Sequence, residues 1–322
     1  MEPPIGCRST SVHGGQMNRI QKVLDRYDAA RSVAEHGVSI FSVGDPAGAQ
    51  LNAAIRLTLY VLGDERSDVW TDLLQSANAL RWRRITQPQP NAYQPAQMQI
   101  VEGVLYQTKR LRYLIGDESL LDQLAAAATA VSETDSPVGT VLLESILESG
   151  AHTCAVVASK GSARAGLQSW LGEFDVPVVV SGGLDGLPVG IEQSFVVAPP
   201  AFVSSALVTA PATPEVTFVM PAWFGNRTLP ESGLGPHAEG RVVVKTTIYQ
   251  IGDTAESVVA VPDEAEVGDT YFPQPVWDVR SSEDREPASD EVDAWKILLA
   301  GGLALWLDDG DRIRSLDPRQ PT

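Results

Sequence analysis

The chain has 322 residues, of which 43% are hydrophobic and 20% are charged, a composition typical of globular proteins. Its formal net charge is -17, and the acidic excess is concentrated in residues 161–322, which carry 24 acidic and 10 basic side chains. This half repels nucleic acid and anionic membranes at long range, so a nucleic-acid contact would need a local basic patch.

The expected cellular compartment follows from the absence of membrane-spanning and signal segments in the sequence. No apolar run is long enough to cross a membrane, and the first residues show neither the basic nor the apolar segment of a signal peptide. The two cysteines, Cys7 and Cys154, have the spacing of neither a disulfide framework nor a zinc site. We therefore expect a cytoplasmic protein without membrane contact.

The first half of the chain is predicted to be mainly helical. Residues 1–16 are rich in Gly, Ser and Pro without any period, and we expect them to be disordered. Residues 17–135 contain several long stretches with helical periodicity and one convincing strand, "VSIFSV". The stretch "RITQPQPNAYQPAQ" holds three prolines and is predicted to be a loop, which could also serve as a hinge.

Residues 136–224 alternate helices with short, apolar, β-rich runs. The helix "SPVGTVLLESILESG" leads into the strand "TCAVVA", and the runs "VPVVV", "SFVVAPP" and "TFVMPAW" follow after a further helix. This pattern is typical of a parallel sheet that helices cover on both faces. We predict an α/β domain whose core contains Cys154, Val156, Val178, Val180, Val196 and Phe218.

Ser159, Lys160 and Gly161 lie between the first of these strands and the helix that follows. Open parallel sheets bind ligands at this position, and the free N–H groups of a helix N-terminus favour anions. The residues do not form a phosphate loop, which requires G-x-x-x-x-G-K-[ST]. They are therefore candidates either for capping the helix or for binding an anion.

Residues 225–322 change character and are predicted to be a β-rich, acidic region. "RVVVKTTIYQIGD" and "ESVVAVPD" resemble strands, and "AWKILLAGGLALWLDDGDRIRSLDP" is typical of three short strands joined by turns. A small β-meander or SH3-like element is the simplest fit. The acidic cluster around Asp308 lacks the spacing of a calcium loop and is interpreted as a solvated turn.

The order of elements from Ser136 to Phe224 resembles the second RecA-like lobe of superfamily 2 helicases. In that lobe a helix leads into a strand such as "CAVVAS", a helix such as "ARAGLQSWLGEF" follows, and strands such as "FVVAPP" and "EVTFVMPAW" come later. The lobe's Q-x-x-G-R-x-x-R finger motif is absent after Pro200, and no Walker A loop or D-E-x-[HD] box stands upstream.

This combination is similar to the helicase-related, catalytically incomplete proteins of bacterial anti-phage islands, including the DrmE-like proteins of DISARM systems. The resemblance implies an accessory role in DNA processing or defence beside a complete motor. It carries over no catalytic residue, because none of the family's phosphate, metal or finger positions matches. It also implies that a second lobe, with which a RecA-like lobe forms its cleft, comes from a partner or has been lost.

Two basic clusters run against the acidic trend. They consist of Arg81, Trp82, Arg83 and Arg84 in "RWRR", and of Lys109, Arg110 and Arg112 in "KRLR". Arginine beside tryptophan would suit nucleic acid, because guanidinium groups bind phosphates while an indole ring stacks on a base. Basic side chains near a helix end also complement the helix dipole. Each cluster is therefore a candidate either for nucleic-acid binding or for a solvated, salt-bridged helix face.

Other chemistry is sparse. His152 and Cys154 could form a nucleophile pair, but Cys154 lies among apolar residues and is interpreted as a buried structural thiol. The histidines lack metal-ligand spacing, so we expect neither a metal site nor a cofactor. Three hypotheses follow: a non-catalytic helicase-related accessory protein that acts through partners such as a helicase or nuclease, an acidic interaction scaffold without a nucleic-acid role, and an enzyme with an unrecognised site. The first is preferred.

Overall fold

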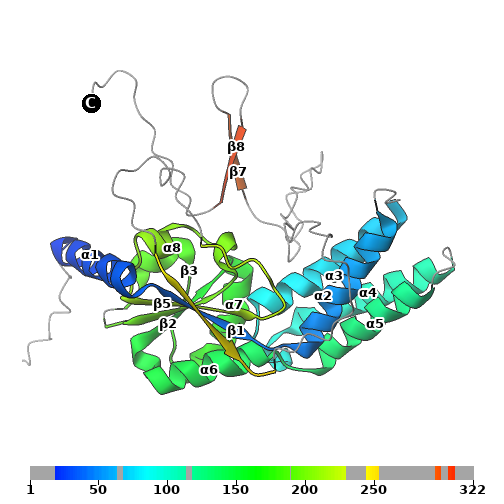
Figure 1. Ribbon diagram of the computed structural model, residues 1–322, viewed down its shortest axis with the longest axis horizontal. Coiled ribbons are helices and arrows are strands. Elements are labelled where there is room, and N and C mark those ends of the chain that lie inside the picture. The colour runs from blue at the N-terminus through cyan, green and yellow to red at the C-terminus, as the bar shows by residue number, and fades with distance from the viewer. Residues whose placement is uncertain are drawn as a thin grey trace, which may run out of the picture.

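The computed structural model describes residues 19–63, 68–113, 118–188, 190–229, 244–253, 294–298 and 304–308. The protein is α/β: a six-stranded, all-parallel sheet carries helices on both faces, and a bundle of four helices projects from it (Figure 1). The predicted disordered start and most of the predicted β-rich region lie outside the described residues. Among the described helices, none combines the length and apolar character that crossing a membrane requires.

The sheet brings together strands from three parts of the sequence. Its order is β3-β2-β4-β5-β1-β6, and every neighbouring pair is parallel. The strands are β1 (Val38–Val43), β2 (Cys154–Ala158), β3 (Val178–Val180), β4 (Gln193–Val197), β5 (Glu215–Pro221) and β6 (Thr246–Ile251). Thus β1 comes from the mainly helical region, and β6 comes from the region predicted to form a separate β-rich unit.

Two glycines show how closely β6 approaches both ends of β1. A Cβ atom on Gly37, whose φ is 87°, would lie 2.4 Å from the Lys245 carbonyl oxygen. A Cβ atom on Gly44 would lie 2.0 Å from the Asp253 carbonyl oxygen. Any larger side chain at either position would push the two backbones apart, so these glycines permit the pairing of β1 with β6.

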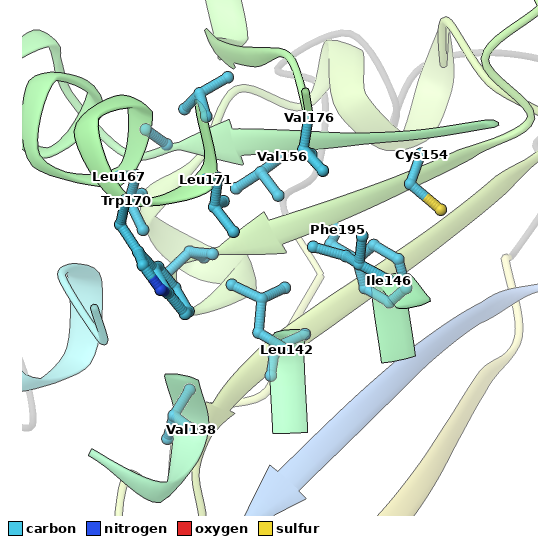
Figure 2. Close-up of a cluster of buried hydrophobic side chains, with 14 of the residues drawn as sticks. Val138, Leu142, Ile146, Cys154, Val156, Leu167, Trp170, Leu171, Val176 and Phe195 are labelled. Carbon is cyan, nitrogen blue, oxygen red and sulfur yellow. The ribbon is translucent and has the colours of Figure 1, made fainter. Parts of the chain in front are cut away.

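Helices cover both faces of the sheet, as predicted. On one face, α6 (Pro137–Ser149) and α7 (Gly161–Leu171) pack on β2 and β4, and Figure 2 shows Leu142, Trp170 and Phe195 within this cluster. On the other face lie α1 (Arg19–His36), the short α8 (Ala206–Thr209) and the end of α3. Five of the six predicted core residues are buried: Cys154, Val156, Val178, Val196 and Phe218. The sixth, Val180, is half-buried on the edge strand β3.

The helical region between β1 and α6 is a four-helix bundle. Its helices are α2 (Pro46–Leu62), α3 (Asp68–Thr86), α4 (Pro95–Arg112) and α5 (Glu118–Glu133). α2 and α4 each pack against both α3 and α5, around a leucine- and alanine-rich core. Because α2 begins directly after β1, the bundle has a base at the sheet and a tip that points away from it (Figure 1).

The proline-rich loop between α3 and α4 is packed into the base of the bundle. It includes the short η1 (Asn91–Tyr93), and the Gln94 side chain donates hydrogen bonds to the carbonyl oxygens of Gln87 and Gln89, at 3.0 and 2.6 Å. A Cβ atom on Gly139 of α6 would lie 2.1 Å from the Pro88 carbonyl oxygen. These contacts hold the loop against the α/β domain, which does not favour the alternative interpretation of a hinge.

Short elements complete the described chain. They are η2 (Ala151–Thr153), η3 (Gly172–Phe174), η4 (Ser181–Gly186), η5 (Pro200–Phe202) and an antiparallel hairpin of β7 (Ala294–Leu298) and β8 (Ala304–Asp308). The hairpin corresponds to the first two of the three short strands predicted near the C-terminus. The third, and the predicted strand "ESVVAVPD", lie outside the described residues.

Candidate functional site

The carboxyl ends of β2 and β4 form the topological switch point of the sheet. After β2 the chain enters α7 on one face, whereas after β4 it enters α8 on the opposite face. The two strands are neighbours, and their outgoing connections diverge to opposite faces of the sheet. Open α/β sheets bind their ligands at such a switch point.

The structure places Ser159, Lys160 and Gly161 together at this switch point. Lys160 is the N-cap residue of α7 and has an extended backbone, with φ -147° and ψ 166°. In the described part of the chain the Ser159 hydroxyl oxygen is buried without a hydrogen-bond partner, and a Cβ atom on Gly161 would meet open space. A buried hydroxyl beside a helix N-terminus has the donors that a small anion requires.

At the carboxyl ends of β1 and β5, the polar side chains form a buried ionic network. Asp45 follows β1 and Trp223 follows β5, while Arg84 belongs to the last turn of α3. Arg84 donates to both Asp45 carboxylate oxygens, from Nη2 at 2.7 Å and from Nε at 3.0 Å, and Trp223 Nε1 donates to the same carboxylate at 3.2 Å. The Arg84 and Asp45 side chains are only 4% and 0% exposed.

This network joins the bundle to the sheet. Arg84 also donates to the carbonyl oxygens of Thr134 and Asp135, at 2.8 and 3.2 Å, and thereby holds the end of α5. A bidentate arginine–carboxylate contact with additional carbonyl acceptors compensates both buried charges. Gly48 makes room for it, because a Cβ atom there would lie 2.1 Å from an Asp45 carboxylate oxygen.

The remaining members of the first basic cluster lie at the same base. The Arg81 guanidinium lies 5.8 Å from the ring centroids of both Trp223 and Phe224, and Arg81 is buried. The Trp82 ring packs edge-to-face on Phe202 at 4.9 Å. Partial burial lowers the pKa of Arg83 from its usual value, because desolvation disfavours the charged form. In this structure Arg81, Trp82 and Arg84 therefore contact protein groups.

The second basic cluster lies at the opposite end of the bundle. Lys109, Arg110 and Arg112 are exposed in the last turn of α4. Arg110 Nη1 lies 3.3 Å from an Asp72 carboxylate oxygen of α3, and Arg112 pairs with Asp122 of α5. The structure therefore keeps the two clusters apart, and the second one takes part in ion pairs on the surface.

The remaining sequence-based candidates are placed clearly. Cys154 is buried in β2, and burial raises the pKa of its thiol, which confirms the interpretation as a structural cysteine. His152 lies exposed in η2. Within the described ranges no group of three or more His, Cys, Asp or Glu side chains could hold a metal ion.

Sequence reasoning gave Asp45 no role in a site and did not connect it with Trp223. One signal was present: Asp45 stands in a "GDP" turn between a strand and a helix, where an acid complements the helix dipole. Its partners are 39 and 178 residues away, and no local pattern connects them.

Comparison with family models, with curated proteins and with solved structures finds no match to this chain.

Proposed function

We propose that the chain is a non-catalytic, cytoplasmic accessory protein that acts through protein partners in DNA processing or anti-phage defence. The observation that carries this proposal is the network of Asp45, Arg84 and Trp223. At the carboxyl ends of the strands, a motor lobe would use its polar groups to bind a ligand. Here the polar groups that follow β1 and β5 instead fix the bundle to the sheet.

The bundle is the part of the protein suited to a partner. The buried network and the packed proline-rich loop hold its base, and its tip projects away from the sheet (Figure 1). Large apolar side chains, among them Tyr60 and Val61 near the end of α2, are exposed on it. Exposed aromatic and aliphatic groups on a rigid support are typical of protein interfaces, because little entropy is lost on binding.

The first test concerns catalysis. We expect the purified protein to show no magnesium-dependent ATP hydrolysis, because the sequence lacks the phosphate loop, the acidic metal box and the finger arginines. A matched Lys160→Ala protein provides the control for contaminating activity. Turnover that this substitution abolishes would overturn the non-catalytic assignment.

The second test concerns partners. Tagged protein is co-expressed with the products of the neighbouring genes, and we expect it to retain a helicase, nuclease or methyltransferase. A Tyr60→Ser/Val61→Ser double variant should retain less of the partner, whereas Tyr27→Ser on α1 should retain the wild-type amount, since all three side chains are exposed. A protein that retains none of these products, or that retains them equally with every variant, would count against the proposal.

A second candidate function is the binding of a small anion at the switch point, which the buried, unpartnered Ser159 hydroxyl favours. Calorimetric titration with inorganic phosphate and with ATP tests it. Binding should weaken in Lys160→Ala and in Ser159→Ala if the ligand sits at the N-terminus of α7. No heat with either ligand would overturn the anion site, and no side-chain cap hydrogen bond is formed at this helix N-terminus in the described structure.

Nucleic-acid contact remains a proposal for the exposed cluster of Lys109, Arg110 and Arg112. Filter binding at low and moderate salt distinguishes its two interpretations. Phosphate contacts would make affinity fall steeply with salt and would be lost in Lys109→Ala/Arg110→Ala. If the filter retains little nucleic acid and these substitutions do not change the amount, the cluster is a salt-bridged surface and the nucleic-acid proposal is wrong.

A further inference from the structure

Helix α4 carries a continuous exposed face that points away from the rest of the bundle. Its members are Met98, Glu102, Tyr106 and Lys109 of α4 and the C-cap residue Tyr113, whose backbone is still helical, and all five are exposed. At the helical repeat, their directions fall within about 80° around the axis. The buried residues of α4 face α3 and α5 on the other side. We call these five residues the outer face of α4.

The outer face is unusually apolar for a solvent-exposed helix surface. Met98 is 55% exposed, Tyr106 is 66% exposed and Tyr113 is 91% exposed. They are distributed over a length of about 22 Å. Methionine and tyrosine are enriched in protein interfaces relative to the rest of the surface, so the composition favours a binding face.

The two charged residues of the outer face are placed so that two antiparallel copies of the face attract each other. Glu102 and Lys109 lie at equal distances from the midpoint of the face, and so do Met98 and Tyr113. When a second α4 runs antiparallel across it, Glu102 of one copy therefore lies opposite Lys109 of the other, and Met98 lies opposite Tyr113. Tyr106 then lies next to the two-fold axis. Each pair occurs twice, as a two-fold interface requires.

We propose that the outer face of α4 binds a second copy of this chain in an antiparallel, two-fold dimer. A parallel arrangement would place Glu102 against Glu102 and is disfavoured by like-charge repulsion. A nucleic acid is disfavoured as the occupant of the whole face, because the face carries one acid for its one base, and Arg110 and Arg112 of the basic cluster lie outside it. The inference does not depend on the accessory role, because it rests on the pattern of α4 alone.

The dimer is expected to be weak. One helix face of about four turns buries less surface than a standard protein interface, so dissociation in the micromolar range is expected. Sedimentation equilibrium of the full chain at concentrations from about 1 to about 200 µM covers this range. We expect a reversible monomer–dimer equilibrium, and a monomer at every concentration would overturn the proposal.

Tyr106→Arg tests the position of the axis. Two arginines would then face each other at the centre of the interface, and the dimer should be lost over the whole concentration range. Tyr27→Arg is the matched control, because Tyr27 is 71% exposed on α1 and lies outside the outer face. At concentrations where the wild type is monomeric, both variants should unfold at the same urea concentration as the wild type. Equal dimerisation of the two variants would contradict the assignment of the face.

A charge-reversal cycle tests the antiparallel register. Glu102→Lys and Lys109→Glu each create two like-charged contacts across the axis, and each should weaken the dimer about tenfold. The double variant Glu102→Lys/Lys109→Glu restores opposite charges and should return to the wild-type dissociation constant. A double variant at least as weak as either single variant would overturn the antiparallel pairing, since only direct contact between the two positions predicts the rescue.

Discussion

The two basic clusters end consecutive helices of one bundle, and they have opposite environments. The cluster around Arg84 ends α3 at the base, where it is buried against the sheet, whereas the cluster around Arg110 ends α4 at the tip, where it is exposed. In both clusters the ion pairs join arginine to aspartate. The difference shows that residue type and position along a helix do not determine a role until the neighbouring element is known.

The largest effect is expected from breaking the buried pair. Arg84→Ala leaves the Asp45 carboxylate buried without its counter-ion, and the free energy of unfolding should fall by about 3–5 kcal/mol. Urea denaturation followed by tryptophan fluorescence measures this, since Trp223 belongs to the network. A loss below about 1 kcal/mol, the value for an exposed pair, would remove the contrast between the clusters.

An intermediate effect is expected from crowding the same network. In Gly48→Ala the new methyl group would lie 2.1 Å from an Asp45 carboxylate oxygen, so the network must shift. We expect a destabilisation of about 1–3 kcal/mol in the same denaturation assay, although alanine favours a helix over glycine. Gly103→Ala on α4 is the matched control, because its nearest neighbour would lie 3.9 Å away, and it should be neutral or stabilising.

The smallest effect is expected at the tip. Arg110→Ala removes an ion pair whose partners are 49% and 55% exposed, so it should change the free energy of unfolding by about 0–1 kcal/mol. Even this effect should diminish in high salt, because exposed pairs are screened. A larger loss that persists in salt would show that Arg110 is coupled to the packing of α3 on α4 and would weaken the comparison.

Several elements could be predicted because their signals are local. Apolar residues at helical spacing mark α4 and α6, and β-branched runs such as "VSIFSV" mark strands, since both patterns record which side of an element is buried. The alternation of these elements between 136 and 224 is sufficient for a parallel sheet with helices on both faces. Placing Ser159 and Lys160 at a strand-to-helix turn required only the order of elements.

The remaining features depend on contacts between distant residues. Nothing near "TTIYQI" indicates that it pairs with β1 rather than with the strands that follow it, because strand pairing depends on which edge of the sheet is left open. Similarly, Asp45 resembles an ordinary helix cap in the sequence. Only the packing of the bundle against the sheet brings Arg84 and Trp223 within hydrogen-bonding distance of it, and burial from water makes that contact strong enough to hold the two parts together.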